Sequence, residues 1–111
     1  MGESVFVDHM GNTPQIRVLD TFLLGRGLEY TLSDISRIAK VTRPTLYKMF
    51  SVLISRKMIT PTRKLGRMQL YVLNQKNPYV QKILTFYLGL AKANSDEYFR
   101  KRKKALTVKV T

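Results

Sequence analysis

The sequence predicts a mainly α-helical chain with a small β-hairpin, which places it in the α+β class. Two observations predict this class: apolar residues recur at helical spacing in several segments, and two short extended segments flank a basic turn. The length of 111 residues suits one domain. The expected order is helix, short strand, short helix, tight turn, helix, hairpin and long helix.

The first helix is predicted to begin at Thr13 and Pro14, because threonine is a common N-cap and proline suits the first helical position. Gly25 marks its expected end. Residues 1–12 are interpreted as an N-terminal arm that packs on the body or on a partner subunit. The β-prone segment LEYTL follows the first helix.

Two short helices come next. Ser33 is expected to cap the second helix, with Asp34 placed to favour its N-terminal dipole, and this helix should end near Lys40. Thr42 is expected to cap the third helix, which runs to about Lys57. The side chains expected to be buried are Ile35, Ile38 and Ala39 in the second helix and Leu46, Met49, Phe50, Leu53 and Ile54 in the third.

The hairpin and the last helix complete the expected fold. The segment MITPTRKLGRMQLYVLN reads as two short strands, and Pro61 favours an edge position. Asn77 and Pro78 predict the start of a long helix. The expected divisions are 1–12 as the arm, 13–75 as the main domain, 76–104 as the last helix with a basic end, and 105–111 as a tail.

This order is the plan of a winged helix-turn-helix, in which one helix enters the major groove of DNA and a hairpin lies beside it. The third helix divides as that role requires, because its apolar back is opposite a polar and basic front. The predicted DNA contacts of this helix are Thr42, Arg43, Pro44, Thr45, Tyr47, Lys48 and Ser51. Arg43 is the candidate for a bidentate contact to guanine. Arg63, Lys64 and Arg67 at the hairpin tip are the predicted wing contacts, near the minor groove.

The charge distribution favours a polyanionic partner. The net charge is +13, and no carboxylate falls between Ile35 and Ser95, where twelve basic residues lie. A domain with such an excess repels itself, and a polyanion relieves that repulsion. Double-stranded DNA is the first candidate, and an anionic membrane surface is the second.

The segments NTPQIRVLDTFLL, YTLSDISRIAKVTRPTLYKMFSVLISRKMI and TRKLGRMQLYVLN resemble the archaeal-type winged helix-turn-helix transcriptional regulators. The resemblance runs from about Asn12 to Asn77 and includes the TRPT-x-YK start of the third helix and the GR-x-x-x-Y-x-LN wing. It implies sequence-specific DNA binding as a homodimer. The sequence differs from the metal-sensing branch of such regulators, because it has no cysteine and only one histidine.

The last helix is predicted to mediate dimerisation, since the rest of the domain leaves little room for so long a helix; packing on the first helix is the alternative. The predicted dimer contacts are Val80, Ile83, Leu84, Tyr87, Leu90 and Ala91. The basic segment from Arg100 to Lys104 either extends the DNA footprint or is a solvated end, and the last seven residues are either disordered or a small added strand.

Other function classes have less support in the sequence. The chain has few acids, one histidine and no phosphate-binding glycine motif, so we expect no enzyme activity, cofactor, metal or small-molecule ligand. The absence of cysteine, of a secretory signal and of a long apolar segment predicts a cytoplasmic, nucleoid-associated protein without a membrane span. An architectural or partition protein that coats DNA is the main alternative; RNA binding is less favoured, because most aromatic residues have helical core spacing.

Overall fold

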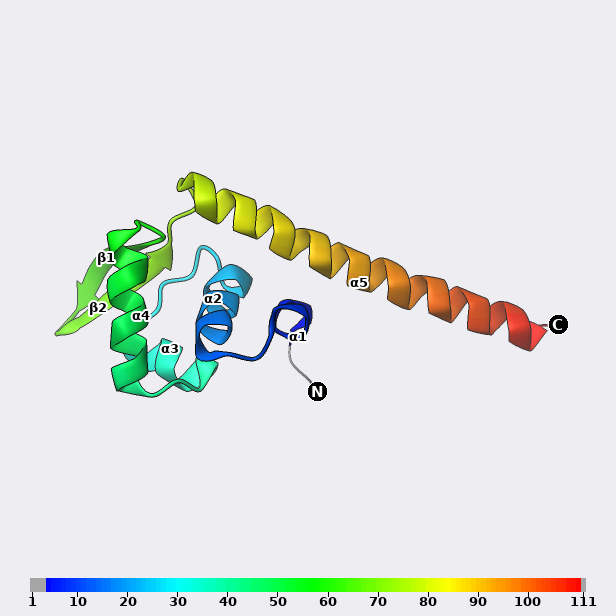
Figure 1. The fold of residues 1–111 in the computed structure, drawn as a ribbon, viewed down its shortest axis with the longest axis horizontal. Helices are drawn as coiled ribbons and strands as arrows, with labels where there is room; N and C mark the ends of the chain where they lie inside the picture. Colours follow the sequence, from blue (N-terminus) through cyan, green and yellow to red (C-terminus); the bar gives the residue numbers. More distant parts are fainter. Residues whose placement is uncertain (1–3, 111) are drawn as a thin grey trace.

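The structure, a computed structural model, describes residues 4–110, with side chains described up to residue 103. In this part of the chain the elements are α1 (Val5–Met10), α2 (Pro14–Leu24), α3 (Leu32–Ala39), α4 (Arg43–Ser55), β1 (Ile59–Leu65), β2 (Met68–Leu73) and α5 (Pro78–Val110). Figure 1 shows a small body from which α5 projects as one long helix, and the Cα atoms span 63 × 28 × 24 Å. The predicted fold class is confirmed.

The core forms where α2, α3, α4 and the hairpin meet. Thr13 caps α2 as predicted, because its hydroxyl accepts a hydrogen bond from the Ile16 N–H at 3.2 Å. Phe22 from α2 packs against Phe50 from α4, with 6.0 Å between the ring centroids. The buried cluster consists of Phe6, Val18, Phe22, Leu23, Ile35, Ala39, Val41, Leu46, Phe50, Ile59, Leu73, Val80 and Tyr87.

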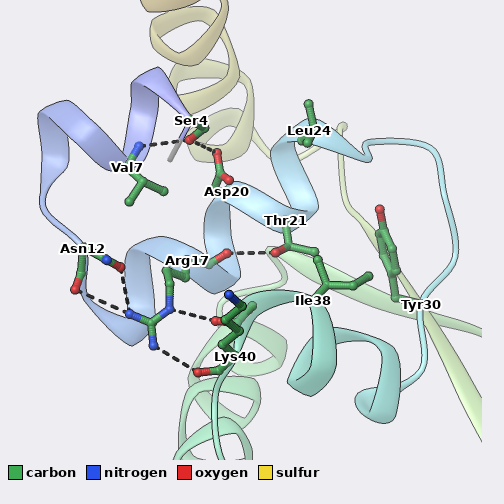
Figure 2. A pocket seen from close by; sticks show the side chains of 11 residues that line it. Ser4, Val7, Asn12, Arg17, Asp20, Thr21, Leu24, Tyr30, Ile38 and Lys40 are labelled. Carbon is green, nitrogen blue, oxygen red and sulfur yellow. Dashed lines mark hydrogen bonds between the residues drawn. The ribbon is translucent and has the colours of Figure 1, made fainter. Parts of the chain in front are cut away.

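The predicted N-terminal arm contains a helix, α1, that packs on the chain's own body. Ser4 caps α1, and its hydroxyl also donates to the Asp20 carboxylate of α2 at 2.7 Å (Figure 2). Phe6 is 2% exposed, and its ring centroid lies 5.3 Å from that of Tyr87 and 6.5 Å from that of Phe86, both in α5. α1 therefore joins α5 to the body.

The predicted cap of α3 is wrong by two positions. Thr31, not Ser33, is the N-cap: its hydroxyl accepts from the Asp34 N–H at 3.1 Å, and the Asp34 carboxylate accepts from the Thr31 N–H at 2.9 Å. This reciprocal pair is a capping box, which satisfies two backbone N–H groups, whereas a single serine cap would satisfy one. Ser33 lies inside the first turn of α3.

We expect Thr31→Ala to lower the free energy of unfolding by about 1 kcal/mol, because the hydrogen bond from the Asp34 N–H to the Thr31 hydroxyl is lost. Chemical denaturation measures the change. Ser33→Ala is the matched control, since it removes a hydroxyl two positions further on, together with its exposed hydrogen bond from Arg43, and leaves both capping bonds in place. An equal loss in the two variants would contradict the assignment of the cap.

Two residues of the expected buried set are exposed. Ile38 is 47% exposed, because α2 and α4 cover the side of α3 that carries Ile35 and Ala39. Ile54 is 40% exposed in the last turn of α4. Both residues lie in the last turn of their helices.

The hairpin and α5 are fastened to the end of α4. β1 and β2 are antiparallel, and their register shifts between Pro61 and Lys64. The Asn77 side chain donates to the carbonyls of Arg56 and Lys57, both at 3.0 Å, and its oxygen accepts from the first amides of α5. The helix continues past the predicted boundary at 104 to Val110, so residues 105–110 are helical rather than disordered or extended. Thr111 lies outside the described residues.

Candidate nucleic-acid interface

α4 has a buried back and an exposed front. Leu46 and Phe50 are buried, and Phe50 packs edge-on against Tyr71 of β2 with 5.0 Å between centroids. Met49 and Leu53 are half-buried beside them. The predicted contacts Thr42, Arg43, Pro44, Tyr47, Lys48 and Ser51 are all exposed, and Thr45 is half-buried. The structure therefore leaves six of the seven predicted residues accessible and the seventh partly so.

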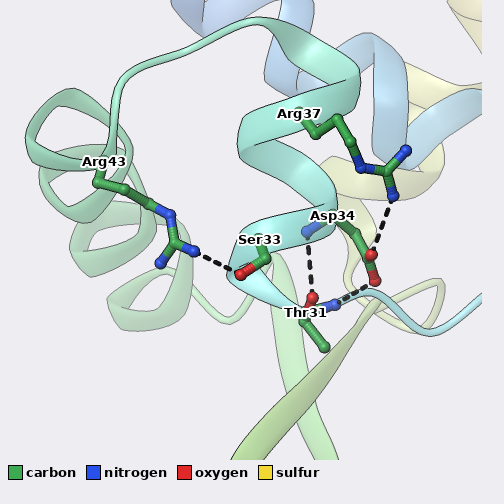
Figure 3. Close-up of polar contacts among 5 residues, drawn as sticks. All are labelled: Thr31, Ser33, Asp34, Arg37 and Arg43. Carbon is green, nitrogen blue, oxygen red and sulfur yellow. Dashed lines mark hydrogen bonds and ion pairs between the residues drawn. The ribbon is translucent and has the colours of Figure 1, made fainter.

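The first turn of α4 differs from the expectation in its details. Thr42 occupies the N-cap position, but its side chain makes no capping bond and its hydroxyl instead donates to that of Thr45 at 3.1 Å. The Arg43 side chain is exposed but has a partner within the chain, because its guanidinium donates a hydrogen bond to the Ser33 hydroxyl in the first turn of α3 (Figure 3). Ser33 is thus a residue of this surface that sequence reasoning assigned to capping.

The wing carries its cations around a tight turn. Gly66 has φ +63°, a left-handed conformation that glycine adopts without strain, and it joins β1 to β2. Lys64 and Arg67 are exposed and form no ion pair within the described residues. These two cations remain available to an anionic partner.

Arg63 is engaged within the chain. Its guanidinium forms an ion pair with Glu29 at 3.0 Å, and Glu29 lies in the loop between α2 and α3. Hydrogen bonds from the Thr62 and Arg63 side chains hold the pKa of the Glu29 carboxyl below its usual value. Arg63 therefore anchors the wing to the body, and the charge of this predicted wing contact is partly neutralised by Glu29.

A cleft separates the start of α3 from the wing. Its volume is about 250 Å³, and its polar lining comes from Thr31, Ser33, Arg43, Arg67 and Gln69. The Asp34 carboxylate, turned back into the capping box, pairs with Arg37 at 3.2 Å rather than with Arg43 (Figure 3). The Thr31 backbone hydrogen bond is the main reason that the pKa of Asp34 is lowered. The two arginines of the cleft thus come from the predicted recognition helix and the predicted wing.

The predicted dimer contacts divide into two groups. Val80 and Tyr87 are buried in the chain's own core, and Ile83, Leu84 and Leu90 pack against that core. Burial, together with the hydrogen-bonded Asp20 carboxylate, raises the pKa of Tyr87 to about 12. Ala91 is half-buried. Much of the predicted dimer surface is therefore already covered by α1 and the body.

The distal part of α5 carries apolar residues that the body leaves open. Leu88 is 43% exposed, Tyr98 56% and Phe99 64%. Figure 1 shows this part of α5 extending well beyond the other elements. Tyr98 and Phe99 were not among the predicted dimer contacts, although Tyr98 lies seven residues beyond the predicted contact Ala91 and so close to the same helical line.

Other site types find no support in the described residues. No group of three or more His, Cys, Asp or Glu side chains there has the placement to hold a metal ion. Within the same part of the chain, no helix combines the length and apolarity needed to cross a membrane.

Known proteins that are similar to this chain were found by structure and not by sequence. No protein-family model matches the chain, and no curated protein sequence matches it. The structure of NadR in complex with 4-hydroxyphenylacetate is similar over 94% of this chain and 74% of NadR, with a TM-score of 0.59 and 16% identity. MepR, a transcription regulator of the Staphylococcus aureus multidrug efflux pump MepA, matches 94% of this chain and 80% of its own, with a TM-score of 0.59 and 16% identity.

The third similar structure is Sso10a-2, a DNA-binding protein from Sulfolobus solfataricus. It covers 82% of this chain and 92% of its own length, with a TM-score of 0.50 and 14% identity. This chain has a winged helix-turn-helix fold. The helix-turn-helix is α3 and α4, the wing is the β1–β2 hairpin, and α5 is the long C-terminal helix. The archaeal-type assignment stays a prediction.

Proposed function

We propose that this winged helix-turn-helix chain is a transcription regulator that binds double-stranded DNA in a sequence-specific manner as a homodimer. The observation that carries the proposal is the division of α4, whose buried Leu46 and Phe50 hold it to the core while Tyr47 and Lys48 face solvent. A helix held in this way fits the major groove, and its front supplies hydrogen-bonding and cationic groups for base edges. The wing then lies near the minor groove.

The charge of the surface supports the same partner. Arg43 and Arg67 line one cleft, and Lys64 extends the positive surface along the wing. The first turn of α4 has no side-chain cap, and helix N-termini favour anions such as phosphate. MepR, which shares the fold, is a transcription regulator, and Sso10a-2 is a DNA-binding protein. These features favour DNA over an unpartnered basic surface.

The homodimer is proposed to form through the distal part of α5. Leu88, Ala91 and Tyr98 follow each other at spacings of three and seven residues, which is the periodicity of paired helices. Val80 and Tyr87 do not belong to this surface, because they are buried within the chain. A second copy is the occupant that fits, since a two-fold axis places two copies of α4 on a palindromic site.

The test of DNA recognition is selection of bound sequences from a random pool, followed by affinity measurements. We expect Arg43→Ala to lower affinity for the selected site by about 1–3 kcal/mol and to relax preference at one base pair per half-site. Arg67→Ala is expected to weaken all sequences more evenly and to reduce the salt slope by about one. Lys82→Ala, which removes an exposed cation of α5, is the control.

The outcomes separate the alternatives. Equal loss on all sequences in Arg43→Ala would show that this residue holds phosphate instead of reading a base. A two-fold symmetric motif among the selected sequences supports a regulator. Binding to many unrelated sequences with similar affinity favours a protein that coats DNA.

A further inference from the structure

The turn between α3 and α4 sets the direction of α4, and its backbone has an unusual conformation. Lys40 has φ +55° and ψ +52°, in the left-handed region that non-glycine residues adopt infrequently. The last carbonyls of a helix have no partner within the helix and need donors from elsewhere. Ala39 is the last residue of α3, Lys40 is its C-cap, and Val41 follows outside the helix, so none of the three carbonyls has a backbone partner within the helix itself.

Each of these three carbonyls accepts a hydrogen bond from a side chain. Ser36, within α3, donates to the Val41 carbonyl at 2.6 Å. Arg17, which comes from α2, donates from Nε to the Ala39 carbonyl at 2.7 Å and from Nη2 to the Lys40 carbonyl at 3.1 Å. Figure 2 shows the guanidinium reaching across from α2 to the turn.

The other end of the guanidinium is also held. Nη1 of Arg17 donates to the Asn12 side-chain oxygen at 2.8 Å, and Asn12 lies in the short link between α1 and α2. All three nitrogens of Arg17 therefore have partners within the chain. A cation beside the last carbonyls of α3 is also favourable for the dipole of that helix.

We propose that Arg17 is a positioning residue for DNA recognition: it fixes the α3–α4 turn and so aims α4, without itself contacting DNA. This inference rests on the proposed function of α4. Arg17 adds to the positive charge of the chain, so the charge pattern alone would assign it to phosphate. Its engaged donors instead connect α2 and the α1–α2 link to the turn.

The experiment compares Arg17→Gln with Arg26→Gln. Arg26 follows α2, and its guanidinium donates to the Leu23 carbonyl, away from the turn, so the control removes the same charge. The first measurement is amide hydrogen exchange of the Val41 N–H, which bonds to the Ser36 carbonyl, at a temperature where both variants are folded. We expect exchange about tenfold faster in Arg17→Gln and unchanged in Arg26→Gln.

The second measurement is affinity for selected and random DNA over a range of salt concentrations. We expect Arg17→Gln to lose about tenfold or more in the ratio of specific to random affinity, with the same salt slope as Arg26→Gln. Arg17→Lys keeps the charge but lacks the planar fork of donors, so it should not restore slow exchange. If Arg17→Gln does not fold, Arg17→Lys takes its place in the comparison with Arg26→Gln.

Equal Val41 exchange in the Arg17 variants and in Arg26→Gln would overturn the proposal. A salt slope lower by about one than that of Arg26→Gln would make Arg17 a phosphate ligand and would overturn it as well. If the wild-type chain shows no sequence preference, the proposed function fails, while the exchange comparison still decides whether Arg17 holds the turn.

Discussion

Phe6→Ala is expected to lower the free energy of unfolding by about 3–5 kcal/mol, the range for removing a buried aromatic side chain. Phe6 is 2% exposed and packs on Phe86 and Tyr87. Its removal leaves a cavity between α1 and α5 and takes away the aromatic contacts that join these two helices. Denaturant unfolding measures the loss.

Tyr79→Ala is the control for this prediction. Tyr79 is an aromatic residue of the first turn of α5 whose side chain is largely exposed, so its removal should change stability by no more than about 0.5 kcal/mol. A similar small effect for Phe6→Ala would mean that α1 is not part of the folded core in solution.

Tyr98→Lys is expected to convert the proposed dimer to folded monomers and to weaken binding to a two-half-site DNA by about 10²–10⁴-fold. A charged residue in the paired α5 surface is repelled by its copy, and a monomer loses the gain that comes from binding two half-sites at once. Sedimentation gives the oligomeric state, and titration against one and two half-sites gives the affinities.

Tyr79→Lys introduces the same substitution on a different side of the same helix and should remain dimeric. This pair is a sharper test than charges at Ile83 or Leu84, because those side chains pack on the core and their loss would also affect folding. A Tyr98→Lys variant that sediments as a dimer would rule out the distal α5 surface.

The order of the elements was predictable because local signals agree with the tertiary structure. Thr13 and Pro14 begin a helix, Gly66 makes the hairpin turn, and Asn77 with Pro78 begins the last helix, each for a reason contained in a few neighbouring residues. The two sides of α4 were predictable from periodicity, since Leu46 and Phe50 are one turn apart.

The cap of α3 was misassigned although the signal was present. Thr31 and Asp34 have the spacing of a capping box, but Ser33 stands immediately before the acid and satisfies the simpler rule for a single cap. The capping box satisfies two backbone donors where a Ser33 cap would satisfy one, and it is therefore the more stable arrangement.

The partners of α5 and of the wing cations depend on contacts between distant segments. A helical stripe shows that Val80 and Tyr87 face something apolar, but not whether that is Phe6 of the same chain or a second copy. Arg63 was predicted only as a wing contact, because its partner, Glu29, is far away in the sequence and carries no local signal.

The attachment of the wing has a consequence for the entropy of binding. Tyr30 and Tyr71 exchange two backbone hydrogen bonds at 2.8 Å, so the segment before α3 pairs with β2, and the Glu29–Arg63 ion pair adds a second connection close by. The hairpin is thus ordered before it meets any partner. Docking such a preordered wing into a groove loses less conformational freedom than ordering a loose loop would, and more of the contact energy remains as affinity.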